Sequence, residues 1–205
     1  MAEIKAKLPE LPEDRRDRFM REYGLPRDDA ELLTSSRNDA DYEEEFIEIF
    51  GKTGEGTRLS PLERAKLGSN WILGEVRRIT NANNIGITDF KQRVSPERLV
   101  NLTGLMVKGS ITGTIAKPVL EEMFKTGKSA EEIIKERGLS QISDTGELEA
   151  AIVDVINSNA QAVSDYKAGK ETALKFLVGQ VMRATKGRAN PVMAGDMLQK
   201  KLEEG

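Results

Sequence analysis

The stretch "DYKAGKETALKFLVGQVMRATKGRANP", residues 165–191, gives the clearest indication of the fold, because helical periodicity and helix-ending residues follow one another in it. Between Lys170 and Thr185 the apolar residues recur at intervals of three and four, which is typical of an amphipathic helix. The predicted buried face comprises Leu174, Leu177, Val178, Val181, Ala184 and Thr185. Gly187 ends this helix, and Asn190-Pro191 provide the N-cap and first position of the next. The stretch therefore predicts two helices joined by a short turn.

Cations follow a second face of the same predicted helix. Lys175, Gly179, Arg183 and Lys186 are spaced by four, four and three residues, and we call these four positions the basic stripe. Cations in line neutralise a phosphate backbone, and a glycine between them allows close approach, so the stripe favours RNA-backbone binding. A solvated surface or a protein contact remains the alternative. Phe176, near Arg183 on the helical wheel, is expected to pack on the previous helix rather than stack on a base.

The rest of the chain is also helical in character. Further helices are expected at about 12–23, from Asp28 or Asp29 to Leu33, from Asn38 or Asp39 to Phe50, from Ser60-Pro61 to "NANNIG", along "SPERLVNLTGLMVKGS", from Ile111, from Lys128-Ser129 to Gly138, around Leu148–Ile156 and from Asn159 to Tyr166. No run of alternating β-branched residues predicts a strand, so the predicted fold class is all-α. A separate apolar pattern after residue 140 predicts three parts: a linker with a short helix (1–27), a helical domain (28–139) and a tail domain (140–205).

Charge is distributed unevenly although the net charge is only -3. Residues 1–50 hold 8 basic and 15 acidic side chains, residues 141–166 hold 5 acidic and no basic ones, and residues 167–201 hold 8 basic and 2 acidic ones. Such polarity steers an anionic partner toward one side. Cysteine and histidine are absent, which excludes disulfides, cysteine nucleophiles, histidine acid–base chemistry and zinc sites built on these residues. No apolar run predicts a membrane span, and a cytoplasmic location is expected.

Three motifs imitate functional sites. Gly51-Lys52-Thr53 and Gly127-Lys128-Ser129 resemble the end of a phosphate-binding loop, but the position that needs a glycine holds Phe46 in one and Glu122 in the other. Nucleotide binding is therefore not expected at either. The acidic run from Asp39 to Glu48 is interpreted as a solvated helix face rather than a metal site, and Trp71 as a core residue.

Several stretches, in this order along the chain, resemble the C-terminal part of the B subunit of the aspartyl/glutamyl-tRNA amidotransferases: "LPELPEDRRDRF", "EYGLP", "DAELLTSS", "SNWILGEV", "GLSQISD", the stretch 165–191 and "LQKKL". The most specific of them is 165–191. The resemblance implies a helical domain followed by a small three-helix-type tail domain of the YqeY-like type. It also implies that the chain begins at the linker after the family's cradle domain. The loop 51–66 departs from the family by being longer and more polar.

The resemblance also implies a function. In this family, Glu-tRNA(Gln) or Asp-tRNA(Asn) is converted to the amide form with ATP and an amide donor, the cradle domain activates the substrate and the A subunit is the amidase. This chain is then a non-catalytic tRNA-binding fragment without catalytic or metal residues or a cofactor of its own, since ATP and Mg²⁺ belong to the parent enzyme. Its implied partners are tRNA(Gln) or tRNA(Asn) and, through the parent enzyme, the amidase A subunit and the small C subunit.

Stripe and family motif together predict a set of tRNA-binding residues: Lys167, Lys170, Lys175, Gly179, Arg183, Lys186, Gly187, Arg188 and Asn190. Two alternatives stay open, a freestanding YqeY-like protein of tRNA metabolism and a protein–protein docking module. The choice between Gln and Asn specificity is not readable from these residues, because RNA is recognised largely by shape.

Overall fold

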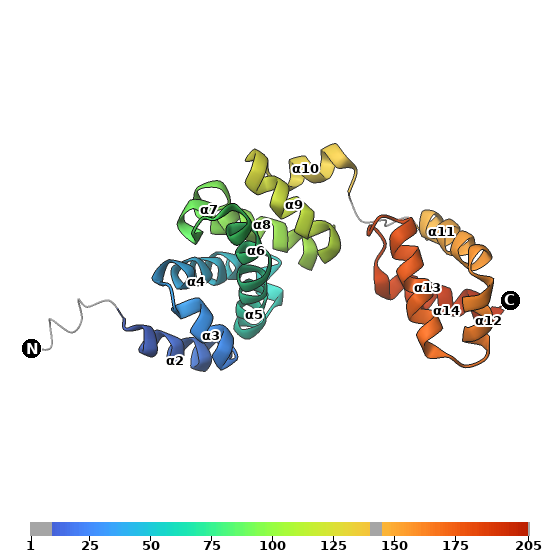
Figure 1. Ribbon diagram of the computed structural model, residues 1–205, viewed down its shortest axis with the longest axis horizontal. Coiled ribbons are helices and arrows are strands. Elements are labelled where there is room, and N and C mark those ends of the chain that lie inside the picture. The colour runs from blue at the N-terminus through green and yellow to red at the C-terminus, as the bar shows by residue number, and fades with distance from the viewer. Residues whose placement is uncertain (1–9, 140–144, 205) are drawn as a thin grey trace, which may run out of the picture. The chain divides into compact units, whose positions relative to one another are not determined.

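The computed structural model describes residues 10–139 and 145–204, and helices account for all regular structure in these ranges (Figure 1). The α-helices are α2 Pro12–Tyr23, α3 Arg27–Thr34, α4 Arg37–Gly51, α5 Pro61–Trp71, α6 Arg77–Asn83, α7 Ile87–Arg93, α8 Pro96–Val107, α9 Gly113–Thr126, α10 Ala130–Arg137, α11 Thr145–Ser158, α12 Ala160–Lys167, α13 Glu171–Ala184 and α14 Pro191–Glu204. A 3₁₀ helix, η1 (Gly56–Arg58), and a π-helix, η2 (Ile72–Val76), complete the set. The predicted all-α fold class is confirmed. The first part of the predicted linker, residues 1–9, and residues 140–144 lie outside the described residues.

Local chemistry explains where several helices begin and end. Gly24 takes the left-handed conformation (φ 62°) after α2, which glycine adopts without the steric cost of a side chain. The Ser60 hydroxyl accepts a hydrogen bond from Glu63 N (3.2 Å), and the Glu63 carboxylate accepts one from Ser60 N (2.8 Å), so a capping box starts α5. Helix α7 was not predicted, because its 7 residues are too short for a recognisable periodic pattern.

Two predicted helix starts are wrong. Asp28 and Asp29 lie inside the first turn of α3 instead of capping it. Ser36, rather than Asn38 or Asp39, is the N-cap of α4, and its side chain accepts a hydrogen bond from Asp39 N at 3.4 Å. In both helices acidic residues lie in the first turn, where the helix N-terminus stabilises their negative charge although they are not the capping residues.

The described residues form two compact units. Residues 10–107 and 120–130 make up the first, and residues 108–119, 131–139 and 145–204 make up the second, so α9 contributes to both. The predicted domain boundaries near residues 27 and 140 remain predictions. Among the helices of residues 10–139 and 145–204, none combines the length and the apolar character that a bilayer crossing requires.

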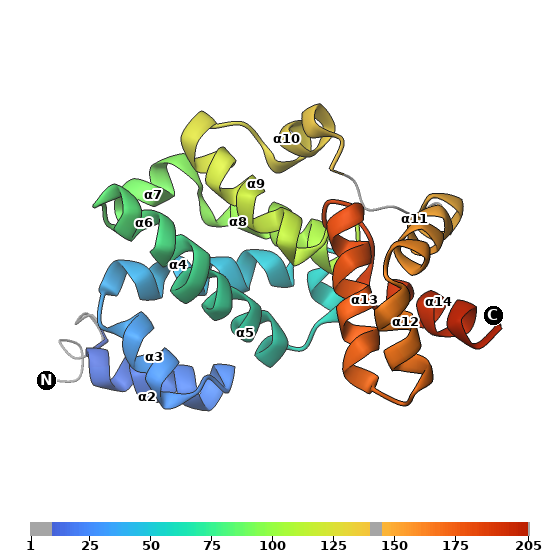
Figure 2. The same ribbon diagram turned by 45° about the vertical axis from the view of Figure 1, so that its right-hand side comes forward.

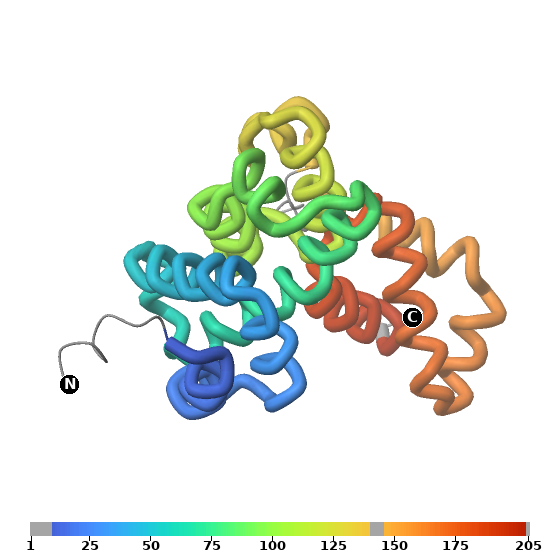
Figure 3. The backbone as a smooth tube through the Cα atoms, turned by 60° about the vertical axis from the view of Figure 1, so that its left-hand side comes forward, coloured from blue at the N-terminus to red at the C-terminus, as the bar shows by residue number. Residues whose placement is uncertain are grey.

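Helix α4 is central to the first unit, where it packs against α3, α5, α7 and α8 (Figure 3). Tyr42, Phe46 and Phe50 of α4 are fully buried, and the Tyr42 hydroxyl donates a hydrogen bond to Val94 O at 2.9 Å. Trp71, 6% exposed, is the core residue that its apolar neighbours predict. Aromatic packing around one helix therefore holds this unit together.

The acidic run of α4 is not the solvated face that the sequence suggests. The Glu43 side chain is fully buried. Asp41 accepts a hydrogen bond from Arg15 at 2.6 Å, and Glu44 accepts one from Arg18 at 2.5 Å, which anchors α2 to α4. Within the described ranges no three acidic side chains are placed so that they could hold a metal ion. Periodicity alone did not reveal these pairs because the partner cations lie on another helix.

The second unit contains a bundle of α11, α12, α13 and α14, which lie side by side at the C-terminal end of the chain (Figure 2). Its core is a single cluster of buried apolar side chains: Leu148, Ile152, Val155, Leu177, Val181, Ala189, Ala194, Leu198 and Leu202. These residues come from α11, α13, α14 and the turn before α14, so one amphipathic face of each helix builds the core. The remaining faces of α12 and α13 are the surface on which the predicted site lies.

Candidate nucleic-acid interface

Helix α13 separates a buried face from a charged one. Leu177 and Val181 are fully buried in the core of the bundle, whereas Lys175, Gly179 and Arg183 are exposed. The three exposed residues are four positions apart, which places them in one row along the helix. The first three members of the basic stripe are therefore arranged as the helical wheel indicates.

The fourth member lies beyond the helix. Helix α13 ends at Ala184, Thr185 is its C-cap, and Lys186 takes a left-handed conformation with φ 52°. The wheel position of Lys186 therefore does not apply, although its side chain is exposed. Ala184, expected on the buried face, is exposed as well, whereas Thr185 beside it is buried.

Two predicted cations lie where α12 leads into α13. Lys167, the last residue of α12, is exposed, and Lys170 is the N-cap residue of α13. The Lys170 ammonium lies 3.0 Å from Asp165 Oδ1, and this hydrogen bond holds the pKa of the Asp165 carboxyl below its usual range. Lys170 therefore already has an anionic partner.

The turn from α13 to α14 uses its residues for structure. Gly187 has φ 77° and is buried, and its carbonyl accepts a hydrogen bond from Thr112 Oγ1 at 2.8 Å. Arg188 forms an ion pair with Glu147 at 2.7 Å. Asn190 caps α14, since its Oδ1 accepts hydrogen bonds from Val192 N (2.9 Å) and Met193 N (3.3 Å). This arrangement confirms the predicted N-cap. Contact of Gly187, Arg188 and Asn190 with tRNA remains a prediction.

Ion pairing divides the cations of the bundle into two groups. Lys170, Arg188 and Lys201 each have a carboxylate partner. Among the residues that the structure describes, Lys167, Lys175, Arg183 and Lys186 form no ion pair. An unpaired exposed cation keeps its full charge available for an incoming anion. Three of these four cations belong to the basic stripe.

Gly179 has open space around it. A Cβ atom added there would have no heavy atom within 4 Å outside the local helix backbone. A glycine inside a helix lowers its stability by about 0.5–1 kcal/mol relative to alanine. Neither packing nor backbone conformation requires glycine here, in contrast to Gly187 with its positive φ. The packing of the described residues therefore does not explain why this position holds glycine.

A hollow beside Phe176 is a feature that the sequence reasoning missed. It has a volume of about 520 Å³ and lies between α12 and the first half of α13. Phe176 is 50% exposed and stands outside the core cluster, and it lines the hollow together with residues of α12. Its packing on the previous helix remains a prediction. The position of Phe176 near Arg183 on the helical wheel was the one feature of the sequence that could have indicated an exposed aromatic ring on the basic side of the helix.

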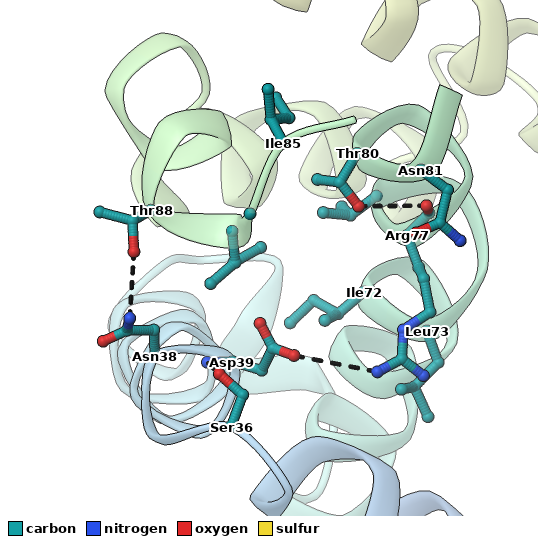
Figure 4. A pocket seen from close by; sticks show the side chains of 13 residues that line it. Ser36, Asn38, Asp39, Ile72, Leu73, Arg77, Thr80, Asn81, Ile85 and Thr88 are labelled. Atoms are coloured by element: carbon teal, nitrogen blue, oxygen red, sulfur yellow. Dashed lines mark hydrogen bonds and ion pairs between the residues drawn. The ribbon is translucent and has the colours of Figure 1, made fainter. Parts of the chain in front are cut away.

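The first unit has a polar pocket of about 280 Å³ between the start of α4, η2, α6 and the start of α7 (Figure 4). Asp39 and Arg77 face each other there at 3.9 Å, and Asn38 Nδ2 donates to Thr88 Oγ1 at 3.1 Å. Burial raises the pKa of Asp39 and outweighs the nearby guanidinium, which lowers it. The paired opposite charges give this pocket no net attraction for RNA.

The two phosphate-loop imitations lie at helix ends. Gly51 is the last residue of α4, and Gly127 follows α9, so a helix rather than a strand leads into each. Lys52 pairs with Glu48 at 2.6 Å. This context agrees with the spacing argument against nucleotide binding.

Comparison with known proteins identifies the family. A family model described as "GatB domain" matches residues 58–202. An aspartyl/glutamyl-tRNA(Asn/Gln) amidotransferase B subunit of Geobacter sp. (strain M21) is 48% identical over 201 residues, which are 98% of this chain and 39% of the relative. The chain belongs to the amidotransferase B subunit family. The B subunit of Carboxydothermus hydrogenoformans is 46% identical over 202 residues (98% of this chain, 39% of the relative), and that of Thermotoga maritima is 43% identical over 203 residues (99% and 39%).

The resemblance predicted from the sequence is thereby confirmed. This member of the B subunit family spans about two-fifths of the length of the relatives that it matches. The basic stripe, the hollow beside Phe176 and the loop that joins α13 to α14 all lie inside the matched residues.

Proposed function

We propose that this chain is the tRNA-binding, non-catalytic C-terminal region of a B subunit that serves the conversion of Glu-tRNA(Gln) or Asp-tRNA(Asn) to Gln-tRNA(Gln) or Asn-tRNA(Asn). Membership of the B subunit family and the names of the relatives support this substrate class. The observation that carries the proposal is the row of exposed, unpaired cations on α13 with the open Gly179 between them.

The geometry suits a phosphate backbone rather than a base edge. Lys175 and Arg183 follow one row of a single helix, so they can neutralise phosphates along one strand of RNA. Gly179 leaves room for the sugar-phosphate chain to reach the helix between them. Lys167 and Lys186 extend the charge at the two ends of α13. Such contacts position an RNA and carry no sequence code.

The proposed organisation follows the family. Residues 1–27 form the linker with a short helix, 28–139 the helical domain and 140–205 the YqeY-like tail. In this proposal the chain works in the cytoplasm together with the small C subunit of the enzyme and the amidase A subunit.

The chemical step is assigned to other parts of the parent enzyme. The chain has neither histidine nor cysteine, and both phosphate-loop imitations follow helices. ATP hydrolysis by the pure chain would contradict this assignment.

Salt dependence of tRNA binding tests the proposal. Each phosphate contact contributes roughly 0.7–0.9 to the slope of log affinity against log salt concentration. Replacing Lys175, Arg183 and Lys186 together by alanine should therefore flatten the slope by about two to three units and weaken binding. The measurement is fluorescence anisotropy of labelled tRNA(Gln) and tRNA(Asn) over a KCl series.

Lys200→Ala is the matched control, because it removes an exposed cation of the same bundle that lies outside the stripe. It should leave the slope within a few tenths of the unchanged chain. If the triple variant keeps both affinity and slope, the stripe is a solvated face. A chain that binds no tRNA even at low salt would favour the protein-docking alternative.

A further inference from the structure

Phe176 is an aromatic side chain that the bundle leaves half exposed. Its sequence neighbour Leu177 is fully buried, and Tyr166, the other aromatic residue of this unit, packs against the core cluster. Phe176, Gly179 and Arg183 are three and four residues apart, so they share one side of α13. An exposed aromatic ring on a basic surface is a typical platform for nucleobase stacking.

The hollow next to this ring has the size of a small-molecule site. Its volume of about 520 Å³ falls within the range of roughly 300–1,000 Å³ that ligand pockets occupy. Ten residues line it: Ser158, Asn159, Ala160, Gln161, Ala162, Asp165, Lys170, Thr172, Ala173 and Phe176. Small alanine side chains leave the space open.

The polar groups of the hollow suit the edge of a base. Asn159 Nδ2 donates to Val155 O at 2.8 Å, so the Asn159 amide oxygen is the group left to accept. Asp165 is held by Lys170 and, at 3.4 Å, by Gln161 Nε2. Carboxylate and amide oxygens accept hydrogen bonds from the amino groups of adenine, cytosine and guanine.

We propose that this hollow receives one unpaired nucleobase of the bound tRNA, which stacks on Phe176 while the basic stripe holds the neighbouring phosphates. The inference rests on the proposed function, because it names a subsite of the same interface. Proteins read single-stranded RNA in loops by splaying a base onto an aromatic side chain. A base is favoured over an apolar peptide because three unpaired cations, Lys167, Lys175 and Arg183, lie on α12 and α13.

The experiment compares Phe176→Leu with the unchanged chain in the tRNA anisotropy assay. Loss of one base–aromatic stack should weaken binding by roughly 5-fold to 150-fold. The salt slope should stay the same, because the substitution removes no charge. Ala160→Leu adds a side chain to the lining of the hollow and should weaken binding in the same way. Val153→Ala, which trims an exposed apolar residue on α11, is the matched control and should bind within about twofold of the unchanged chain.

Phe176→Trp provides a direct readout of stacking. It should bind tRNA as well as the unchanged chain, and the emission of the added tryptophan should be quenched on binding, above the background of the buried Trp71. Unchanged affinity of Phe176→Leu together with unquenched emission of Phe176→Trp would overturn the base subsite while leaving phosphate binding by the stripe intact. An unchanged chain that does not bind tRNA would overturn both proposals. Far-UV circular dichroism of each variant checks that the helices are retained.

Discussion

Gly179 is the residue at which helix stability and the proposed RNA contact make opposite demands. A Cβ atom at this position would have no neighbouring atom within 4 Å outside the local helix backbone, yet glycine makes the exposed helix less stable than alanine does. Gly195 in α14 differs, since a Cβ there would make an ordinary contact with Val178 at 3.7 Å. The two glycines therefore predict different outcomes on substitution.

Gly179→Ala should raise the free energy of unfolding by about 0.5–1 kcal/mol, because alanine is the better helix former. Gly179→Leu should fold normally and yet weaken tRNA binding, with little change of salt slope, because the leucine obstructs the approaching backbone. Urea denaturation and the anisotropy assay measure the two effects. Gly195→Ala is the control and should leave tRNA binding unchanged. Full affinity of Gly179→Leu would show that nothing approaches the helix at this point.

Glu43 is the most unusual buried residue of the first unit. Neither of its carboxyl oxygens has a hydrogen-bond partner. A Cβ at Gly68 would lie 2.8 Å from both oxygens, so the glycine is what makes room for the acid. Burial, and secondly the charge of Glu44, raise the pKa of Glu43 well above its ordinary value. The side chain is therefore protonated over a wider pH range than an exposed glutamate.

This raised pKa predicts a pH-dependent stability. The native state holds the Glu43 proton more tightly than the unfolded chain does, so the contribution is fully present below about pH 4.5 and is lost as pH rises through the native pKa. The Gln side chain of Glu43→Gln does not titrate, so the variant does not lose this contribution as pH rises. The unfolding free energy of the unchanged chain should therefore fall relative to that of the variant with increasing pH. Urea titrations followed by Trp71 fluorescence from pH 4 to pH 9 measure this difference. The exposed Glu48→Gln is the control: Lys52 lowers the pKa of Glu48, so this variant should not gain stability relative to the unchanged chain as pH rises. A stability difference between Glu43→Gln and the unchanged chain that stays constant with pH would refute the prediction.

At the scale of elements, α13 performs two tasks with one periodic pattern. Its apolar residues meet α11, α12 and α14, while its other face carries Lys175, Gly179 and Arg183. The helix ends through Lys186 and Gly187, two consecutive residues with positive φ (52° and 77°). Lysine at the first of these positions costs conformational energy that glycine would avoid. The turn therefore keeps a cation where folding alone favours glycine.

Leu177→Ala tests the core side of this helix. Opening a cavity at a fully buried leucine should cost about 2–5 kcal/mol. Amide hydrogen exchange over α11 to α14 should accelerate accordingly, whereas exchange in α4 and α5 should not change. Val153→Ala, on an exposed site, should alter stability by less than about 0.5 kcal/mol. Equal acceleration in both units would show that they unfold as one.

At the scale of the whole molecule, the uneven charge along the chain acquires a structural meaning. The acidic residues of α4 are largely used within the first unit, where Arg15, Arg18 and Lys91 pair with Asp41, Glu44 and Glu45. In the second unit the cations of α13 are left without internal partners among the described residues. The net charge of only -3 therefore does not show that α13 carries unpaired positive charges. Such charges attract an anion most effectively at short range, where salt screens the interaction least.

The helical class, the helix starts at Ser60-Pro61 and Asn190-Pro191, and the row of Lys175, Gly179 and Arg183 could all be predicted from the residues alone. All of these depend on interactions within one or two helical turns, which a short stretch of residues encodes. The tertiary structure alone decided which charges are satisfied and which side chains are covered. Glu43 is buried because α5 closes over it at Gly68, and Arg188 is engaged because Glu147 comes from a helix 41 residues away. Phe176 stays half exposed because α12 leaves a hollow beside it. Packing between distant segments sets these outcomes, and no local periodicity contains them.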